Sequence, residues 1–399
     1  MSSSSSLSSL QPQGAPSLVT PDHAWPTTLQ SHPDGDLIRT ETAVVYCEAN
    51  FAGIDGKTAN GLVRHSQKYN ILSVIDSQKA GLDTGMVLDG QPNGIPIHAS
   101  LADALLLADG TPDYFIYGMA PSSGMLSASE RGIVLEAITL GMNIVNGLHE
   151  FLNDDPEFIA ASAANAVKMI DVRRPRPTKA LRVFSGRITD VTCPRIAVLG
   201  TDCAIGKRTT ATALVAALTD IGLKAVMICT GQTGLIQGAR YGIALDAVPS
   251  QFCAGELEAT IIEAFEAEQP DVIVIEGQGA LSHPAFSTSS FILRGSCPDA
   301  VVLQHAPGRV NRCDFDGMAM PTPDTEIKLI ETFSETRVIG LTLNHEHMSF
   351  SEVTAAISSY EGELGIPATD VLTRPVEHLV QMVLTAFPSL ETPQLSERQ

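Results

Sequence analysis

The chain has 399 residues, of which 44% are hydrophobic and 18% charged, and this fits a globular protein of about two domains. Its formal net charge of −20 at pH 7 argues against sequence-independent binding of nucleic acid, which needs a basic face. A small anionic substrate or cofactor is still compatible with this charge, because a few basic residues can dominate their own pocket.

No run of about 18 apolar residues is present, so we expect no membrane span. The seven cysteines are scattered singly without a C-x-x-C pair, which predicts neither a zinc knuckle nor a disulfide framework. Unpaired thiols suit a reducing compartment, and we therefore expect a cytoplasmic protein. The oligomeric state stays open, a homo-oligomer included.

Residues 1–38 open with MSSSSSLSSL and contain no lysine or arginine, so they lack the basic character of a transit or secretory peptide. We predict a disordered, serine-rich tail for this stretch. The last twelve residues, 388–399, are also predicted to be a tail.

Residues 39–180 alternate between apolar strands and helices. Strands are expected at Thr42 to Phe51, Tyr69 to Asp76 and Pro112 to Ala120, and a helix between Ser127 and Gly141. This order predicts a Rossmann-like α/β domain. Asp76 closes the second strand where a dinucleotide fold places its ribose-binding acid, but the nearby glycines do not form G-x-G-x-x-G. A bound coenzyme and a scaffold without one both stay open.

Four polar residues lie at the carboxyl end of the strand expected over 142–148, and a helix is expected from His149 to Val167. Asn143, Asn146, His149 and Glu150 lie where open α/β sheets place ligands, although they also suit a turn. Residues 168–191 then hold five arginines, two lysines and two prolines, which predicts an interdomain linker. The charge of this linker could also face an anionic ligand.

The sequence PRIAVLGTDCAIGKRTTATAL, residues 194–214, predicts a buried strand, a glycine-bounded loop and a helix that begins near Lys207. Such a loop points several backbone N–H groups at one spot, where the helix N-terminus and a lysine add positive charge. We predict a phosphate-binding loop, with an ordinary glycine-rich turn as the alternative. Its residues are Gly200, Thr201, Asp202, Cys203, Ala204, Ile205, Gly206, Lys207, Arg208, Thr209 and Thr210.

The loop departs from the Walker A pattern in two ways. Gly200 and Gly206 enclose five residues where the pattern has four, and Arg208 replaces the hydroxyl that binds Mg²⁺. Further apolar strands and helices follow this loop, including a strand over 272–275. Residues 181–387 are therefore predicted to form a P-loop NTPase-like domain with a doubly wound parallel sheet.

Several polar residues follow the strands of this second domain. Glu276 stands at a strand end, where a carboxylate can hold Mg²⁺, together with Thr209, or act as a base. His283 is the second candidate for the base, and Asp202 and Asp246 are comparable candidates. Structural roles are the alternative for each histidine. The predicted substrate-binding residues are Arg294, Arg309, His305 and Gln232, with the arginines suited to a carboxylate.

The motifs GTDCAIGKRTT, TGQTG, EGQGALSHPAFS and QHAPGR resemble a P-loop family of former unknown function. Its characterised branch is the D-glutamate N-acetyltransferases, and the resemblance runs from about Arg39 to Phe387. It implies that the loop holds the phosphates of acetyl-CoA, that an acidic amino acid accepts the acetyl group, and that arginine holds its carboxylates. Glu276 or His283 would then be the base.

The loop also resembles that of dethiobiotin synthetase, an ATP-dependent ligase with threonine after the lysine, where this chain has Arg208. Three hypotheses follow: an acetyl-CoA-dependent N-acetyltransferase, a ligase or kinase that uses ATP with Mg²⁺, and a nucleotide-sensing protein without turnover.

Overall fold

The computed structural model describes residues 41–106, 108 and 110–390, which belong to one compact unit. The predicted tail 1–38 lies outside the described residues, as do residues 391–399 of the C-terminal tail. Pro388–Leu390 instead forms a 3₁₀ turn in which Leu390 is buried. Within the described part of the chain, no helix combines the length and the apolar character that crossing a membrane requires.

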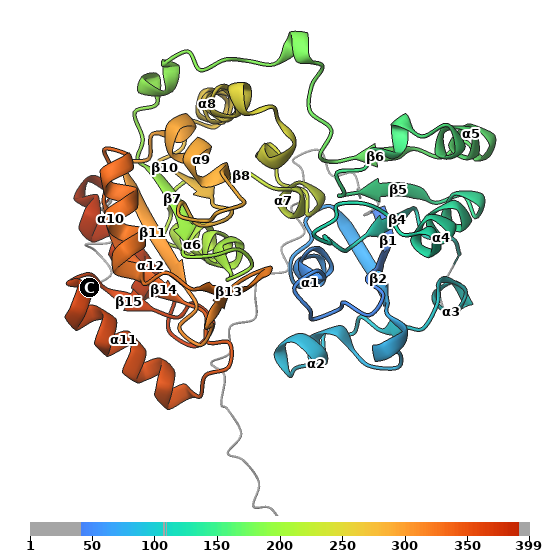
Figure 1. Ribbon diagram of the computed structural model, residues 1–399, viewed down its shortest axis with the longest axis horizontal. Coiled ribbons are helices and arrows are strands. Elements are labelled where there is room, and N and C mark those ends of the chain that lie inside the picture. Colours follow the sequence, from blue (N-terminus) through green and yellow to red (C-terminus); the bar gives the residue numbers. More distant parts are fainter. Residues whose placement is uncertain (1–40, 107, 109, 391–399) are drawn as a thin grey trace, which may run out of the picture. The chain divides into compact units, whose positions relative to one another are not determined.

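The first sheet confirms the predicted Rossmann-like fold (Figure 1). Its six strands pair in parallel in the order β3-β2-β1-β4-β5-β6, which is the strand order of dinucleotide-binding folds. The strands are β1 (Glu41–Tyr46), β2 (Tyr69–Ile75), β3 (Ile97–His98), β4 (Tyr114–Tyr117), β5 (Asn143–Asn146) and β6 (Met169–Asp171). The helices are α1 (Lys57–Arg64), α2 (Thr84–Asp89), α3 (Leu101–Leu106), α4 (Ala128–Thr139) and α5 (Pro156–Asn165).

Asp76 shapes the turn that follows β1. Its carboxylate is fully buried and accepts hydrogen bonds from the backbone N–H groups of Ala49 (3.2 Å), Phe51 (3.1 Å) and Gln78 (3.0 Å). The first strand therefore ends at Tyr46 rather than at Phe51. Because these bonds engage both oxygens of Asp76, its carboxylate is not open to a ribose.

The helix expected after β5 begins later than the sequence pattern suggested. Asp155 caps α5 by accepting hydrogen bonds from the N–H groups of Glu157 and Phe158, and Pro156 occupies the first helical position. Residues Leu152–Asp154 form a separate 3₁₀ turn before it. His149 and Glu150 consequently lie in a loop at the carboxyl end of β5.

The second sheet is also parallel and confirms the predicted P-loop fold class, with the order β15-β14-β11-β7-β10-β8-β9. Its strands are β7 (Arg195–Gly200), β8 (Ala225–Cys229), β9 (Tyr241–Gly242), β10 (Val272–Glu276), β11 (Ala300–His305), β14 (Val338–Leu343) and β15 (Ala368–Thr369). A short antiparallel hairpin, β12 (Asn311–Arg312) and β13 (Phe315–Ala319), follows β11.

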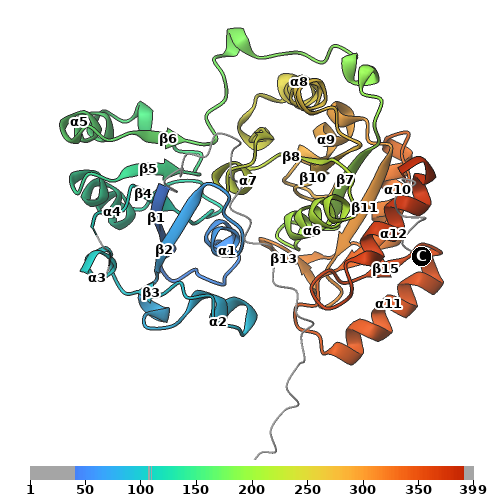
Figure 2. The ribbon, with the colours of Figure 1, turned by 180° about the vertical axis from the view of Figure 1, so that it is seen from behind.

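Helices cover both faces of the second sheet (Figure 2). One face packs against α8 (Ser250–Glu268), α9 (Thr288–Ser296), α10 (Pro323–Phe333) and α11 (Phe350–Leu364). The other face packs against α6 (Lys207–Asp220) and α12 (Glu377–Ala386). The short helix α7 (Gln232–Ile236) follows β8, and its Ile236 packs into the core of the first sheet.

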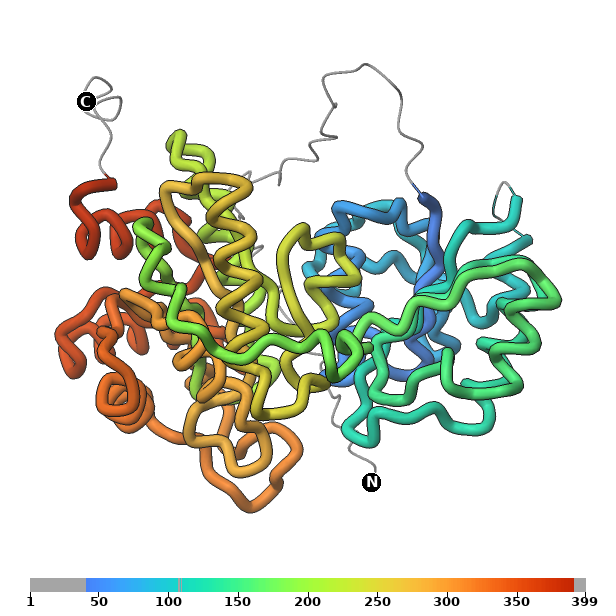
Figure 3. The backbone as a smooth tube through the Cα atoms, turned by 90° about the horizontal axis from the view of Figure 1, so that it is seen from above, coloured from blue at the N-terminus to red at the C-terminus, as the bar shows by residue number. Residues whose placement is uncertain are grey.

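The basic segment between the two sheets runs beside α8 (Figure 3). Its arginines pair with acidic side chains of the chain itself: Arg173 with Asp246 (2.8 Å), Arg174 with Asp154 (2.8 Å), Arg182 with Glu256 (2.9 Å) and Arg187 with Glu266 (2.7 Å). Glu256 is fully buried, so its pairing anchors this segment to α8. These ion pairs neutralise the arginines that the sequence analysis had considered as possible partners of an anionic ligand.

Candidate functional site

The predicted phosphate-binding loop connects β7 to α6, as the sequence pattern indicated. Gly206 stands at the start of α6 with a φ of +99°, a conformation that favours glycine. Gly206 has no side chain that could cap the first turn of this 14-residue helix, so this turn can offer its N–H groups to an anion. The Lys207 ammonium is buried and donates a hydrogen bond to the carbonyl oxygen of Asp202. Burial lowers the pKa of Lys207 to about 8.

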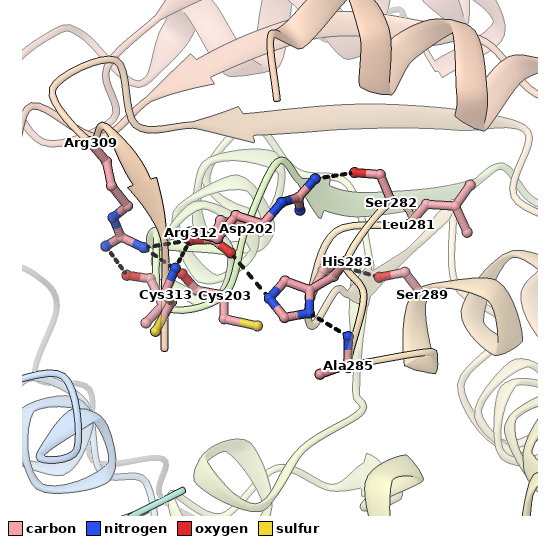
Figure 4. A network of polar contacts seen from close by, with 12 residues as sticks. Asp202, Cys203, Leu281, Ser282, His283, Ala285, Ser289, Arg309, Arg312 and Cys313 are labelled. Atoms are coloured by element: carbon pink, nitrogen blue, oxygen red, sulfur yellow. Dashed lines mark hydrogen bonds and ion pairs between the residues drawn. The ribbon is translucent and has the colours of Figure 1, made fainter. Parts of the chain in front are cut away.

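The outer side of the loop is braced through Asp202 (Figure 4). Its Oδ2 atom accepts hydrogen bonds from Arg309 Nη1 (3.0 Å) and from the Cys313 N–H of the hairpin (2.7 Å). Arg309 also donates to the carbonyl oxygen of Cys203 (2.9 Å) and to Glu346 (2.7 Å). Its guanidinium thus holds carboxylates of the chain itself. A substrate-binding role for Arg309 stays a prediction.

The inner side of the loop rests on β11. The Thr201 N–H donates to the carbonyl oxygen of Gln304 (3.0 Å), and the Thr210 hydroxyl donates to the Gln304 side chain (2.6 Å). The Thr201 hydroxyl lies 2.9 Å from His305 Nδ1. Burial lowers the pKa of His305 to about 4, so its ring is neutral at pH 7. His305, a predicted substrate-binding residue, therefore supports the loop through its contact with the Thr201 hydroxyl.

Arg208 turns toward the end of β10 and pairs with Glu276. The distance between Arg208 Nη1 and Glu276 Oε2 is 3.0 Å, and the two side chains are 22% and 9% exposed. The same nitrogen lies 3.1 Å from Cys229 Sγ, and Nε donates to the Gln237 side chain. Among the described residues, no hydrogen bond joins the Thr209 hydroxyl to Glu276. In other P-loop proteins, the threonine after the lysine and an acid on a neighbouring strand bind Mg²⁺ together. Here the Arg208 guanidinium lies beside that acid, Glu276, instead.

Gly234 makes room for this ion pair, and its replacement by alanine is expected to disrupt it. A Cβ atom at this position would overlap Arg208 Nη1 and lie 2.6 Å from Cys229 Sγ. We expect Gly234→Ala to lower the melting temperature and weaken ligand binding. Gly231→Ala is the matched control, because a Cβ there would meet only Gln278 Nε2, at 3.4 Å. Thermal unfolding of both variants is the measurement, and equal melting temperatures would contradict this packing.

His283 is enclosed beside Asp202 (Figure 4). Its ring lies between those of Phe286 and Phe315, at centroid distances of 4.6 and 5.5 Å. The Nδ1 atom accepts a hydrogen bond from the Ala285 N–H (3.2 Å), and Nε2 lies 3.6 Å from Asp202 Oδ1. Burial lowers the pKa of His283, so the ring is neutral at pH 7, with its proton on Nε2 facing Asp202.

Asp202, Cys203 and His283 are residue types that bind zinc, and their ligand atoms lie within 4.8 Å of one another. Within the part of the chain that the structure describes, neither Asp202 Oδ1 nor His283 Nε2 has a hydrogen-bond partner. If His283 Nε2 bound a metal, the ring proton would have to move to Nδ1. There it would face the Ala285 N–H, so that two donors would point at each other. The charges of Arg309 and Lys207 also surround Asp202. This geometry favours an imidazole N–H that faces the carboxylate over a bound cation.

Two predicted substrate residues lie apart from the loop contacts. Arg294 is exposed on α9 and stacks on the Phe333 ring, at 5.0 Å from its centroid. Gln232 is 5% exposed, and its Nε2 atom has no hydrogen-bond partner among residues 41–106, 108 and 110–390. Glu276, His283, His305 and Arg309 thus lie at the phosphate-binding loop, whereas Arg294 lies on the exposed face of α9. A substrate-binding role for Arg294 and Gln232 stays a prediction.

Sequence reasoning missed three residues that shape the loop: Gln237, Gln304 and Cys313. Gln304 was detectable, because it interrupts the apolar strand AVVLQH. Gln237 and the backbone of Cys313 act through contacts with Arg208 and Asp202 that no local pattern indicates.

Comparisons with known proteins agree with this architecture. The family model of the DUF1611 C-terminal P-loop domain, a domain of unknown function, matches residues 182–380. The model of the DUF1611 N-terminal Rossmann-like domain matches residues 77–175. A crystal structure of a DUF1611 family protein from Anabaena variabilis ATCC 29413 superposes with a TM-score of 0.79 at 30% identity, covering 86% of this chain and 99% of that chain.

Two curated relatives carry the name D-glutamate N-acetyltransferase. The protein from Pseudoalteromonas sp. is 33% identical over 273 residues, which is 67% of this chain and 80% of the relative. The protein from Tritonibacter scottomollicae is 30% identical over 262 residues, which is 64% of this chain and 76% of the relative.

Proposed function

The chain belongs to the DUF1611 family, and we propose that it is an N-acetyltransferase that uses acetyl-CoA to acetylate a glutamate-like amino acid. Two relatives named D-glutamate N-acetyltransferase support the reaction class and the acceptor. The open N-terminus of α6 and the buried Lys207 support a phosphorylated ligand.

The ion pair between Arg208 and Glu276 is the observation that favours acetyl-CoA over ATP as the ligand of the phosphate-binding loop. Nucleotide hydrolysis at a P-loop needs Mg²⁺, held by the hydroxyl after the lysine and by an acid on a neighbouring strand. Here Arg208 replaces the hydroxyl and neutralises that acid with its own positive charge. Such a loop can bind phosphate groups without a metal. This suits coenzyme A, whose phosphates are needed for binding and do not react.

Acetyl transfer is expected to proceed without Mg²⁺. Purified protein is incubated with acetyl-CoA and D-glutamate, once with Mg²⁺ and once with Mg²⁺ omitted, and released CoA is measured with a thiol reagent. We expect equal rates in both buffers, because Arg208 already neutralises the acid that would hold Mg²⁺.

Glycine in place of D-glutamate tests the acceptor class, and we expect little CoA release from it. Strict dependence on Mg²⁺, or ADP release from ATP with an acidic amino acid, would contradict the proposal and favour the ligase or kinase.

A further inference from the structure

We propose that His149 is the general base of the acetyl transfer, oriented by Asp246, and that the side-chain amide of Gln232 stabilises the oxyanion of the thioester. This inference rests on the proposed function and places the reacting groups at the carboxyl end of β5, beside the start of α7. Coenzyme A carries its thioester on a long flexible arm, so the chemistry need not lie at the phosphate-binding loop itself.

The loop after β5 holds His149 in a defined position. The N–H groups of His149 and Glu150 both donate to the carbonyl oxygen of Gly124, at 3.0 and 3.1 Å. Gly124 has a φ of +65° and lies against the imidazole ring, where a Cβ atom would be 2.9 Å from His149 Cδ2. The turn around Gly124 therefore fixes both the backbone and the ring of His149.

Asp246 faces one nitrogen of this ring. The distance between His149 Nε2 and Asp246 Oδ2 is 3.8 Å, and apo enzymes often show such contacts longer than in the complex with substrate. Arg173, which is 6% exposed, holds Asp246 Oδ2 through Nε (3.1 Å) and Nη2 (2.8 Å). Arg173 also donates to the carbonyl oxygen of Gly147.

The other nitrogen of the ring is available to a substrate. The His149 side chain is 46% exposed, and no hydrogen bond to its Nδ1 atom is present within the described ranges. An Nε2–H that points at Asp246 leaves the lone pair on Nδ1, the arrangement that a base oriented by a carboxylate requires. His283 differs, since its buried Nδ1 already accepts the Ala285 N–H.

Partial burial and two nearby cations lower the pKa of His149 below 6.5, which favours the neutral ring at pH 7. Burial lowers its pKa, the charges of Arg173 and Lys57 lower it further, and that of Asp246 raises it. The charge of Lys57 also lowers the pKa of Lys207, so Lys57 acts on both His149 and the phosphate-binding loop. The helix that begins at Gln232 also contacts the phosphate-binding loop, because Gln237, at its end, accepts a hydrogen bond from Arg208.

Gln232 supplies a donor beside this base. Its Nε2 atom is buried and has no hydrogen-bond partner in the described part of the chain, a state that usually costs free energy. The side chain lies against Gly147, two residues before His149, where a Cβ atom would be 3.3 Å from Gln232 Cγ. A thioester oxygen would satisfy this amide, and the bond would strengthen as negative charge develops on that oxygen.

The step balances with these groups alone. The amino nitrogen of the acceptor attacks the thioester carbon, the N–C bond forms, and the carbonyl oxygen becomes an oxyanion that accepts the Gln232 N–H. His149 Nδ1 takes the proton from that nitrogen. When the intermediate collapses, the C–S bond breaks, and the imidazolium returns the proton to the thiolate of CoA.

The test replaces His149 by alanine in the full-length protein. We expect kcat for CoA release to fall by about a hundredfold or more, which is the usual contribution of a general base. The Kd of acetyl-CoA should stay within about twofold. Added imidazole should restore part of the rate, an effect that a purely structural role would not produce. His98→Ala, which changes a half-buried histidine on β3 at the far edge of the same sheet, is the matched control.

Asp246 is tested as a positioning residue through the pH profile. The wild-type kcat/KM should rise with pH and level off above a pKa below the usual 6.5, because only neutral His149 is a base. Asp246→Asn removes the charge that raises this pKa, so the acid limb should move to lower pH.

Two results for His149→Ala would overturn the inference: a wild-type kcat, or a reduced kcat that imidazole does not restore. In either case, CoA release by the wild-type protein would still uphold the proposed function. Absence of CoA release from the wild type with every acidic amino acid would overturn both.

Discussion

Replacement of Lys207 by alanine is expected to weaken the binding of acetyl-CoA by about tenfold or more, because it removes the positive charge at the start of α6 that would face the phosphates. Its ammonium now bonds the carbonyl oxygen of Asp202, and an arriving phosphate would offer it a charged partner instead. Titration calorimetry measures the change. Lys328→Ala is the control, since Lys328 pairs with Asp324 on the exposed face of α10. Unchanged affinity in Lys207→Ala would contradict a phosphate site at this loop.

The pH dependence of binding tests the same lysine. Burial lowers the pKa of Lys207 to about 8, and only the protonated form attracts phosphate. Affinity should therefore be highest below pH 8 and fall as the pH rises from 8 to 9. Above pH 8, binding should also take up a proton, which calorimetry in two buffers of different ionisation enthalpy detects. Affinity that stays constant across this range would contradict the role of Lys207.

Replacement of Arg208 by alanine is expected to lower the free energy of unfolding by roughly 3 kcal/mol, the usual cost of leaving one partner of a buried ion pair alone. Glu276 is 7% exposed and would lose the guanidinium nitrogen that lies 3.0 Å from its Oε2 atom. Denaturant unfolding, monitored by circular dichroism, measures the loss.

A double-mutant cycle isolates the ion pair from other effects. In Arg208→Ala with Glu276→Gln, the uncompensated charge is gone, and we expect much of the stability to return. Arg187→Ala is the control, because the Arg187 pair with Glu266 is exposed on both sides and surface pairs contribute little. Additive losses in the cycle would contradict a direct coupling between Arg208 and Glu276.

The fold class and the phosphate-binding loop could be predicted because both depend on local order in the sequence. A strand, a glycine-bounded loop and a helix with Lys207 at its start follow one another within 194–214. The continuous apolar strands also indicated parallel sheets covered on both faces, as the burial of β10 and β11 confirms.

The contacts inside the site could not be predicted, because they join residues far apart in the chain. Arg208 and Glu276 are 68 residues apart and meet only because β10 pairs with β7, with Glu276 opposite Val198. Arg309 was expected to hold the carboxylate of a substrate, and that role stays a prediction. Its partners, Asp202 and Glu346, lie in the chain itself and depend on how the hairpin and the loop after β14 fold back.

The claim that an arginine takes the place of the metal is tested most directly by calorimetry of acetyl-CoA and of ATP, each with and without Mg²⁺. We expect acetyl-CoA to bind with the same affinity in both buffers, and Mg²⁺ to give ATP no advantage, because Arg208 already neutralises Glu276. Tight binding of ATP only in the presence of Mg²⁺, with no heat from acetyl-CoA, would contradict the account.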